Sequence, residues 1–267
     1  MKRKSRHLPH DDFGGLLRDL RSTRAAMDRR ELLRVAVSLG AFTLFGCSDT
    51  GTDTSGTGNG NCSRINEETA GPFPGEGSNG PNVLNQTGVV RGDIRASFGG
   101  LSGTADGIPL SVVLNLVSAS SCAALAARAV YLWHADRLGR YSLYSSGVTN
   151  QNYLRGVQEA DANGRVSFTT IFPGCYAGRW PHIHFEVYPS LPAAASVANK
   201  IATSQIALPK SACDQAYATT GYESSVANLA QVSLATDNVF SDGSALELAT
   251  MSGSVGAGLS ATLTVAV

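Results

Sequence analysis

The sequence predicts an all-β fold, a β-sandwich with long loops, in one domain over residues 62–267. From Cys62 onward, short apolar runs are separated by Gly, Pro, Asn and Asp, with little sustained helical periodicity. No internal repeat is present in the sequence, which favours a sandwich over a solenoid or a propeller. At 267 residues and 43% hydrophobic content, the chain is long and apolar enough to bury one large core.

Six segments have the pattern of β-strands. The first two are nearly continuous apolar runs, as in buried strands, and the last alternates apolar and polar residues like a closing strand. The third and fourth flank Asp161-Ala162-Asn163-Gly164, whose Asn-Gly pair predicts a hairpin turn because both residues tolerate positive φ. Two other stretches, 193–201 and 226–234, are expected to be loops or short helices. In chain order, the predicted strands are residues 110–116, 129–133, 156–160, 165–171, 182–188 and 259–265.

The first 46 residues differ from the rest of the chain in charge. They hold 10 Lys and Arg against 5 Asp and Glu, which leaves residues 47–267 with a net charge near −5. A basic surface is therefore not indicated in the predicted domain, and we expect no nucleic-acid partner.

The same residues have the pattern of an export signal. Arg29 and Arg30 precede an apolar run, residues 35–45, that is too short to span a bilayer stably. The run ends in Leu44-Phe45-Gly46-Cys47, which resembles a bacterial lipobox, and the paired arginines resemble a Tat signal. We therefore expect residues 1–46 to be a Tat-type lipoprotein signal segment. Cys47 would then carry a lipid anchor that holds an exported protein at the membrane, in the periplasm or on the cell surface.

The residues after Cys47 are polar and small. Residues 48–60 contain no apolar side chain that could attach to a core, so 47–61 is predicted to be a flexible tether. In an oxidising compartment the later cysteines could form up to two disulfides in any of three connectivities, and no Cys-x-x-Cys pair suggests a zinc-thiolate site. These four cysteines are Cys62, Cys122, Cys175 and Cys213.

The segment His182-Ile183-His184 is the main candidate for chemistry. Residues i and i+2 of a strand lie on the same face, so both imidazoles point the same way while Ile183 faces the core. The histidines then occupy the more polar face, where a metal ion could be reached. A His-x-His pair alone is also typical of a solvated polar face. Together with His134 it would fit a copper or zinc hydrolase or oxidase.

Two tyrosines and an arginine accompany the histidines. Tyr176 and Arg179 lie in a turn-rich stretch just before them, and Tyr141 follows a glycine turn further upstream. In the order Tyr, Tyr, Arg-x-x-His-x-His, these residues resemble the intradiol ring-cleavage dioxygenases, most closely the exported branch of that family. Similarity to the family also covers residues 68–73, 93–95, 152–157 and 237–240.

The resemblance implies an immunoglobulin-like or transthyretin-like sandwich that binds one ferric ion, Fe(3+), through Tyr141, Tyr176, His182 and His184. Phenolates are hard anionic donors that suit this ion, whose charge would deprotonate them. A catechol-type diol would chelate the iron and displace Tyr176, which would then accept a substrate proton. O2 would open the ring to a cis,cis-muconate type diacid.

The resemblance also implies roles around the metal. Arg179 would stabilise negative charge on the ring, and Thr69, Pro72 and Phe73 would approach the substrate pocket. His134 is expected to be structural or to lie behind the ligands, because relatives bind iron without it. Cys175 is expected to be oxidised to a disulfide that stiffens the ligand loop.

One alternative is a non-catalytic β-sandwich lipoprotein that binds catechols or catecholate siderophores. The presence of Arg179 argues against it, because chelation alone does not need the arginine.

Only five residues separate Tyr176 from His182, fewer than in the familiar cytoplasmic enzymes. This spacing predicts a shallow pocket that accepts substituted catechols. The sequence does not specify which catechol is used, or whether the chain is a monomer or an oligomer.

Overall fold

The computed structural model describes residues 62–267. The predicted signal segment, the predicted tether and Cys47 lie outside the described residues. Within residues 62–267, no helix combines the length and the apolar character needed to cross a membrane.

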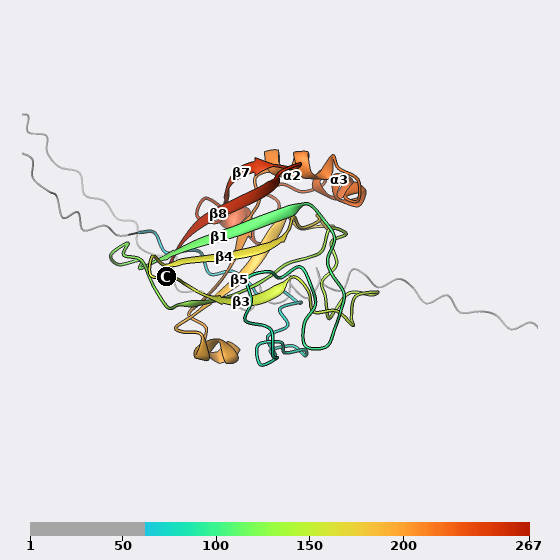
Figure 1. Cartoon of the computed structure of the whole chain (residues 1–267). Helices are drawn as coiled ribbons and strands as arrows, with labels where there is room; N and C mark the ends of the chain where they lie inside the picture. The colour runs from blue at the N-terminus through green and yellow to red at the C-terminus, as the bar shows by residue number, and fades with distance from the viewer. Residues whose placement is uncertain (1–61) are drawn as a thin grey trace, which may run out of the picture.

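Two four-stranded sheets pack against each other, which confirms the predicted β-sandwich (Figure 1). One sheet has the order β4-β1-β8-β7 and the other β3-β2-β5-β6. β1 and β8 are parallel, and the other paired strands are antiparallel. All six predicted strands are present, with ends within one residue of those expected. The strands are β1 (Pro109–Val117), β2 (Ala129–Trp133), β3 (Arg155–Glu159), β4 (Arg165–Ile171), β5 (His182–Tyr188), β6 (Ala202–Ala207), β7 (Thr250–Ser254) and β8 (Gly258–Ala266).

The main apolar core lies between the two sheets. Ile183, Phe185 and Val187 of β5 are fully buried and belong to the same apolar cluster as Val112 and Leu114 of β1. Alternation along β5 therefore directs one set of side chains into the core, as the sequence predicted, and the other set to the opposite face.

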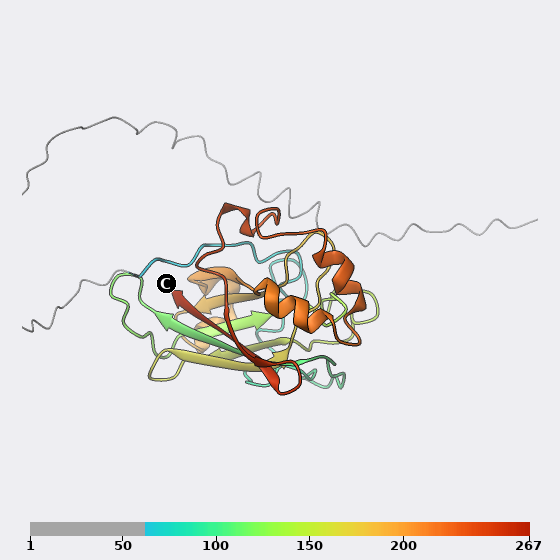
Figure 2. The same ribbon diagram turned by 90° about the horizontal axis from the view of Figure 1, so that it is seen from above.

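The sequence did not predict β6, β7 or helix α2. β6 has only one large apolar residue, Ile206, yet all six of its residues are buried because it pairs with β5 and is covered by other segments. The helices are α2 (Lys210–Tyr217) and α3 (Glu223–Leu229), with 3-10 turns η1 (Pro192–Ala195), η2 (Val197–Asn199) and η3 (Phe240–Asp242). Figure 2 shows α2 and α3 at the end of the sandwich away from the C-terminus. The expectation of loops or short helices at 193–201 and 226–234 is confirmed.

The predicted tight turn at 161–164 is present, but the prediction that it joins two paired strands is wrong. The Gly164 amide donates to the Asp161 carbonyl at 2.9 Å, and Gly164 has φ +73°. A side chain at Gly164 would also collide with the Leu116 carbonyl oxygen. However, β3 and β4 belong to different sheets, so the turn carries the chain from one layer to the other. A turn signal fixes the reversal of the chain but not the strand with which each arm pairs.

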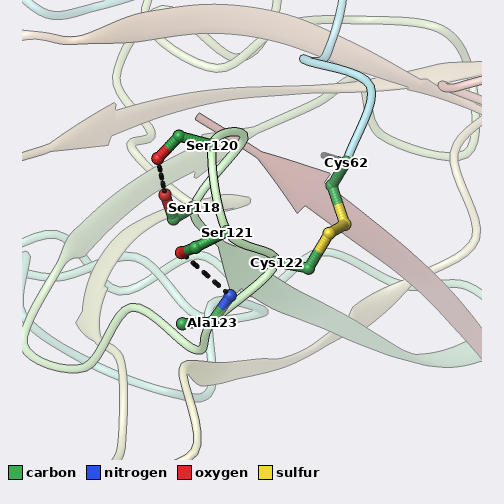
Figure 3. The surroundings of a disulfide bond; sticks show 6 residues. All are labelled: Cys62, Ser118, Ser120, Ser121, Cys122 and Ala123. Carbon is green, nitrogen blue, oxygen red and sulfur yellow. Dashed lines mark hydrogen bonds between the residues drawn. A yellow bond between two sulfur atoms is a disulfide. The ribbon is translucent and has the colours of Figure 1, made fainter. Parts of the chain in front are cut away.

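One disulfide, between Cys62 and Cys122, closes the beginning of the described chain onto the loop after β1 (Figure 3). The Cys62 amide also donates to the Ala119 carbonyl in that loop. Cys175 and Cys213 are buried and free, so the expectation that Cys175 is oxidised is wrong. Burial raises the pKa of the Cys175 thiol to about 12, which leaves it an unreactive thiol beside the ligand loop.

Candidate active site

The site is built on the second face of β5. His182 and His184 are 3% and 2% exposed, so the histidine face is buried rather than open to solvent. The Trp133 ring of β2 stacks on the His184 imidazole with ring centroids 4.9 Å apart. Gly71 lies beside the same ring, where an added Cβ would be 3.3 Å from His184 Cε1. The absence of a side chain at Gly71 therefore allows the backbone to cover the imidazole.

Four polar side-chain atoms converge at this face. They come from β5, from the turn after β2 and from the loop before β5. Each lies within 3.5 Å of at least two of the others. The distances are Tyr141 OH to His182 Nε2 3.3 Å, Tyr141 OH to His184 Nε2 3.2 Å, Tyr141 OH to Tyr176 OH 3.5 Å, Tyr176 OH to His182 Nε2 3.3 Å, and His182 Nε2 to His184 Nε2 3.1 Å.

His182 presents an unprotonated ring nitrogen to the cluster. His182 Nδ1 lies 2.5 Å from the Trp180 carbonyl, so it carries the proton and leaves the Nε2 lone pair free. Burial lowers the pKa of His182 and of His184 well below the usual value, and the Arg179 charge and the neighbouring imidazole, respectively, add to this effect. Both side chains are therefore neutral, which is the form that binds metal ions.

The two tyrosines reach the cluster from separate loops. Gly139, with φ +78°, makes the turn before Tyr141, and a Cβ at Gly139 would be 2.9 Å from the Tyr176 Cβ. The two loops therefore pack closely only because position 139 is glycine. Burial, and next the neighbouring Tyr176, raise the pKa of Tyr141 well above its usual value. Tyr141 would need a nearby cation to become a phenolate.

This donor set fits a metal ion. First-row ions bind nitrogen and oxygen donors at about 2.0–2.2 Å, so donors that share one ion lie about 3 Å apart, as these do. Within the part of the chain that the structure describes, no three His, Cys, Asp or Glu side chains gather to hold a metal. The two tyrosines are therefore needed to complete a site with His182 and His184.

His134 does not join the cluster. Its Nδ1 lies 2.8 Å from the Ala135 carbonyl and its Nε2 lies 2.6 Å from Thr170 Oγ1, so both ring nitrogens are occupied. These two contacts agree with a structural role for His134. They also leave the copper or zinc alternative, which needs His134 as its third histidine ligand, without that ligand.

Arg179 lies beside the cluster and is held by two residues that the sequence did not identify as partners. Its Nε donates to Asp237 Oδ2 at 2.9 Å and its Nη2 donates to Gln205 Oε1 at 2.7 Å. Burial alone would lower the pKa of Arg179, but the nearby Tyr176 and Asp237 outweigh it and raise that pKa. The guanidinium is therefore charged and fixed in orientation.

Asp237 holds more than the arginine. The same Oδ2 accepts the Trp180 amide at 2.6 Å, while Oδ1 accepts the amides of Val239 and Phe240. Asp237 thus connects the segment that enters β5 to η3, across 58 residues of sequence. No local pattern in the sequence signals such a partner.

The three predicted pocket residues lie in one segment that crosses this face. The Thr69 carbonyl accepts Gln205 Nε2 at 2.9 Å, and the Phe73 ring packs on the Tyr141 ring at a centroid distance of 5.0 Å. Pro72, between them, accepts a hydrogen bond from Asn79 through its carbonyl. The structure thus brings Thr69 and Phe73 into contact with groups at the donor cluster.

A surface cavity of about 390 Å³ lies elsewhere on the molecule. Its walls include Asp93, Asp106, Pro109 and Ile171, and none of the four donor residues contributes to them. The cavity therefore has no part in the chemistry of the donor cluster.

Comparisons with known proteins point to one family. The family model described as "Dioxygenase" matches residues 80–191, a range that contains all four donor residues and Arg179. No curated protein matches the sequence.

Several solved structures resemble this chain, and two of them share its fold. An intradiol ring-cleavage dioxygenase from Tetranychus urticae has a TM-score of 0.60 and 24% identity, covering 77% of this chain and 94% of that chain. A second structure, described as a dioxygenase, has a TM-score of 0.61 with the same identity and coverage. A 3-chlorocatechol 1,2-dioxygenase from Rhodococcus opacus has a TM-score of 0.48 and 16% identity, covering 75% of this chain and 71% of that chain. The family match and the shared fold together confirm the resemblance predicted from the sequence: the chain is similar to the intradiol ring-cleavage dioxygenases.

Proposed function

We propose that the chain is an Fe(III)-dependent intradiol dioxygenase that cleaves catechol-type diols with O2 to cis,cis-muconate type diacids. The observation that carries this proposal is the convergence of two phenol oxygens and two imidazole nitrogens, each of which lies 3.1–3.5 Å from at least two of the others. The dioxygenase family match over the same residues supports it.

In this proposal Tyr141, Tyr176, His182 and His184 hold the iron. The ion would supply charge that deprotonates the phenols and draws electron density from a bound catecholate, which prepares the ring for O2. Two anionic oxygen donors favour the ferric over the ferrous ion, because hard anions stabilise the higher charge. Burial of the imidazoles keeps them neutral and available as ligands.

The two tyrosines would have different tasks. Tyr141 is 1% exposed and is enclosed by Phe73, whereas Tyr176 is only partly buried and is followed by the exposed Ala177 and Gly178. Tyr176, the more exposed of the two, would be the ligand that gives way to a diol, and its phenolate oxygen would accept a substrate proton. Tyr141 would remain in place.

Arg179 would act on the charge of the substrate. Two of its nitrogens are fixed by Asp237 and Gln205, and its charge interacts with both tyrosines. A guanidinium held in this way stabilises negative charge that develops on the ring without having to reorganise during the reaction. The same fixed charge would orient an anionic diol on entry.

The proposal is tested by oxygen uptake. Purified, iron-loaded protein mixed with catechol should consume O2 and release a ring-opened diacid that can be identified by mass spectrometry. A Tyr153→Phe variant is a matched control, because the Tyr153 hydroxyl donates to Asp136 and not to the cluster. Catechol binding without oxygen uptake would overturn the proposal in favour of the non-catalytic binding protein.

The five-residue spacing between Tyr176 and His182 supports a second part of the proposal, a shallow pocket that accepts substituted catechols. Values of kcat/KM should therefore be similar for catechol, a methylcatechol and protocatechuate, since each missing apolar contact is worth only about 1–3 kcal/mol. A preference above about 10⁴ for one small diol, near 5.5 kcal/mol, would contradict it.

We also propose that the enzyme is exported and anchored to the membrane through a lipid on Cys47, on the basis of the sequence pattern at residues 29–47. Cys47→Ser should move the protein from the membrane fraction to the soluble fraction and leave oxygen uptake intact. A wild-type protein found only in the soluble fraction after export would contradict the anchor.

A further inference from the structure

Arg155, the first residue of β3, is buried in an unusual way. It is 1% exposed, and none of the ion pairs formed within residues 62–267 includes it. A guanidinium buried without a carboxylate is costly unless every donor finds an acceptor. The acceptors around the Arg155 guanidinium therefore show which segments this residue holds together.

The Arg155 guanidinium makes five hydrogen bonds, all to carbonyl or hydroxyl oxygens. They join the N-terminal segment of the described chain, at Phe73 and Pro74, to β2 and to the loop after Tyr141. The bonds are Nη1 to the Pro74 carbonyl 2.6 Å, Nη1 to Tyr131 OH 3.1 Å, Nη2 to the Phe73 carbonyl 2.8 Å, Nη2 to the Ser142 carbonyl 3.0 Å, and Nε to Ser142 Oγ 3.1 Å.

Three of the four residues that Arg155 contacts lead to a proposed iron ligand. Ser142 is the neighbour of Tyr141 in the chain, and the Phe73 ring packs on the Tyr141 ring at 5.0 Å. Tyr131 stacks on Trp133 at 5.0 Å, and Trp133 stacks in turn on His184. Arg155 thus supports Tyr141 from two sides and His184 through two stacked rings.

We propose that Arg155 is a positioning residue that fixes Tyr141 against the N-terminal segment and so sets the geometry of the donor cluster. This inference rests on the proposed function for its metal readout. A planar guanidinium can bridge three segments at once, whereas a lysine ammonium on one flexible stem cannot reproduce the fork. Arg155→Lys keeps the charge and loses the geometry, which makes it the informative variant.

Arg91 provides a matched control. Its guanidinium also forms no ion pair within residues 62–267; it donates to the backbone carbonyls of Arg155, Ala96 and Ile94 and packs over the Phe98 ring. It touches neither Phe73 nor Ser142, so Arg91→Lys should lower stability without disturbing the donor cluster. Comparing the two variants separates a loss of stability from a loss of positioning.

The experiment measures the release of iron from the holoenzyme to a chelator and the position of its visible absorption band. Arg155→Lys should release iron about 10- to 100-fold faster, the usual effect of losing a partner behind a metal ligand, and should shift the band. Arg91→Lys should change neither the rate of iron release nor the absorption band when the two variants are compared at temperatures equally far below their melting temperatures. Wild-type behaviour in Arg155→Lys, or equal changes in Arg91→Lys, would overturn the inference.

A second measurement does not depend on iron. In metal-free protein, hydrogen exchange should rise at residues 70–75 and 139–146 in Arg155→Lys and not in Arg91→Lys. If wild-type protein binds no iron but this exchange pattern is found, the proposed function fails while the positioning by Arg155 stands. Unchanged exchange in Arg155→Lys would refute the positioning itself.

Discussion

The two faces of β5 are both buried, but they are buried by different means. Ile183, Phe185 and Val187 enter the core between the sheets, where size and apolar character are enough. His182 and His184 are covered by loops, and each of the polar groups around them needs a defined partner. Burial of the core face therefore follows from the local sequence pattern, whereas burial of the site face depends on segments that are distant in the sequence.

This difference explains how much could be predicted. A period of two residues was enough to assign β5, its core side chains and the shared direction of the histidines. The resemblance supplied Tyr141, Tyr176 and Arg179 as candidates. Burial of the histidine face could not be predicted, because the covering residues such as Gly71 lie more than 100 positions away in the sequence.

Other features lay beyond sequence reasoning for similar reasons. Asp237 and Arg155 meet their partners only through the tertiary fold; both lie in segments that resemble the family, but the resemblance assigned neither residue a partner. β6 was missed because its residues are small or polar, and its neighbours rather than its own pattern make it a strand. The turn at 161–164 was recognised, but its crossing between sheets depends on the global topology.

The largest effect is expected on the core face. Phe185→Ala should lower the free energy of unfolding by about 3–5 kcal/mol, because it removes a fully buried ring and leaves a cavity. Turnover per bound iron should be unchanged at a temperature where the variant is folded. Denaturant unfolding followed by circular dichroism, combined with oxygen uptake, checks both. A loss of turnover per iron would show that the two faces are not separate.

On the site face, Arg179→Ala should lower turnover, in contrast to Phe185→Ala, which should lower stability. The value of kcat should fall by about 10²–10³-fold, or about 2.7–4 kcal/mol, because a fixed charge beside the substrate is lost. Iron content should be retained, because Arg179 is not one of the four donors. Steady-state kinetics and metal analysis on the same preparation make this comparison. Iron lost in proportion to activity would make Arg179 structural instead.

Loss of the disulfide tests what holds the segment with Thr69 and Phe73 in place over the site. The double variant Cys62→Ser, Cys122→Ser should be less stable by about 2–4 kcal/mol, because a 60-residue loop is no longer closed in the unfolded chain. Turnover at low temperature should persist, since Gln205 and Arg155 still hold Thr69 and Phe73. Thermal unfolding and oxygen uptake measure the two effects. Loss of turnover in the folded variant would show that the disulfide itself positions the segment.

The smallest effect concerns two carboxyl groups near the edge of β6. Burial, and next Glu247, raise the pKa of Glu68 to about 8, and burial raises the pKa of Glu247 to about 7. Both values lie above the usual 4.5, so the folded state binds these protons more tightly than the unfolded state. Stability should therefore fall as the pH rises from about 5 through 8. Glu68→Gln and Glu247→Gln should each flatten this dependence in melting temperatures measured between pH 5 and 9, and an unchanged slope would contradict the assignment.

The visible absorption spectrum of the purified, iron-loaded protein tests the central claim most directly. Ferric iron bound to tyrosinate gives a strong charge-transfer band, which zinc cannot produce. We expect such a band, altered in Tyr176→Phe because one phenolate donor is lost, and unaltered in Tyr153→Phe. A colourless protein, or a band that is the same in Tyr176→Phe as in wild type, would contradict the assignment of the donor cluster as a ferric site.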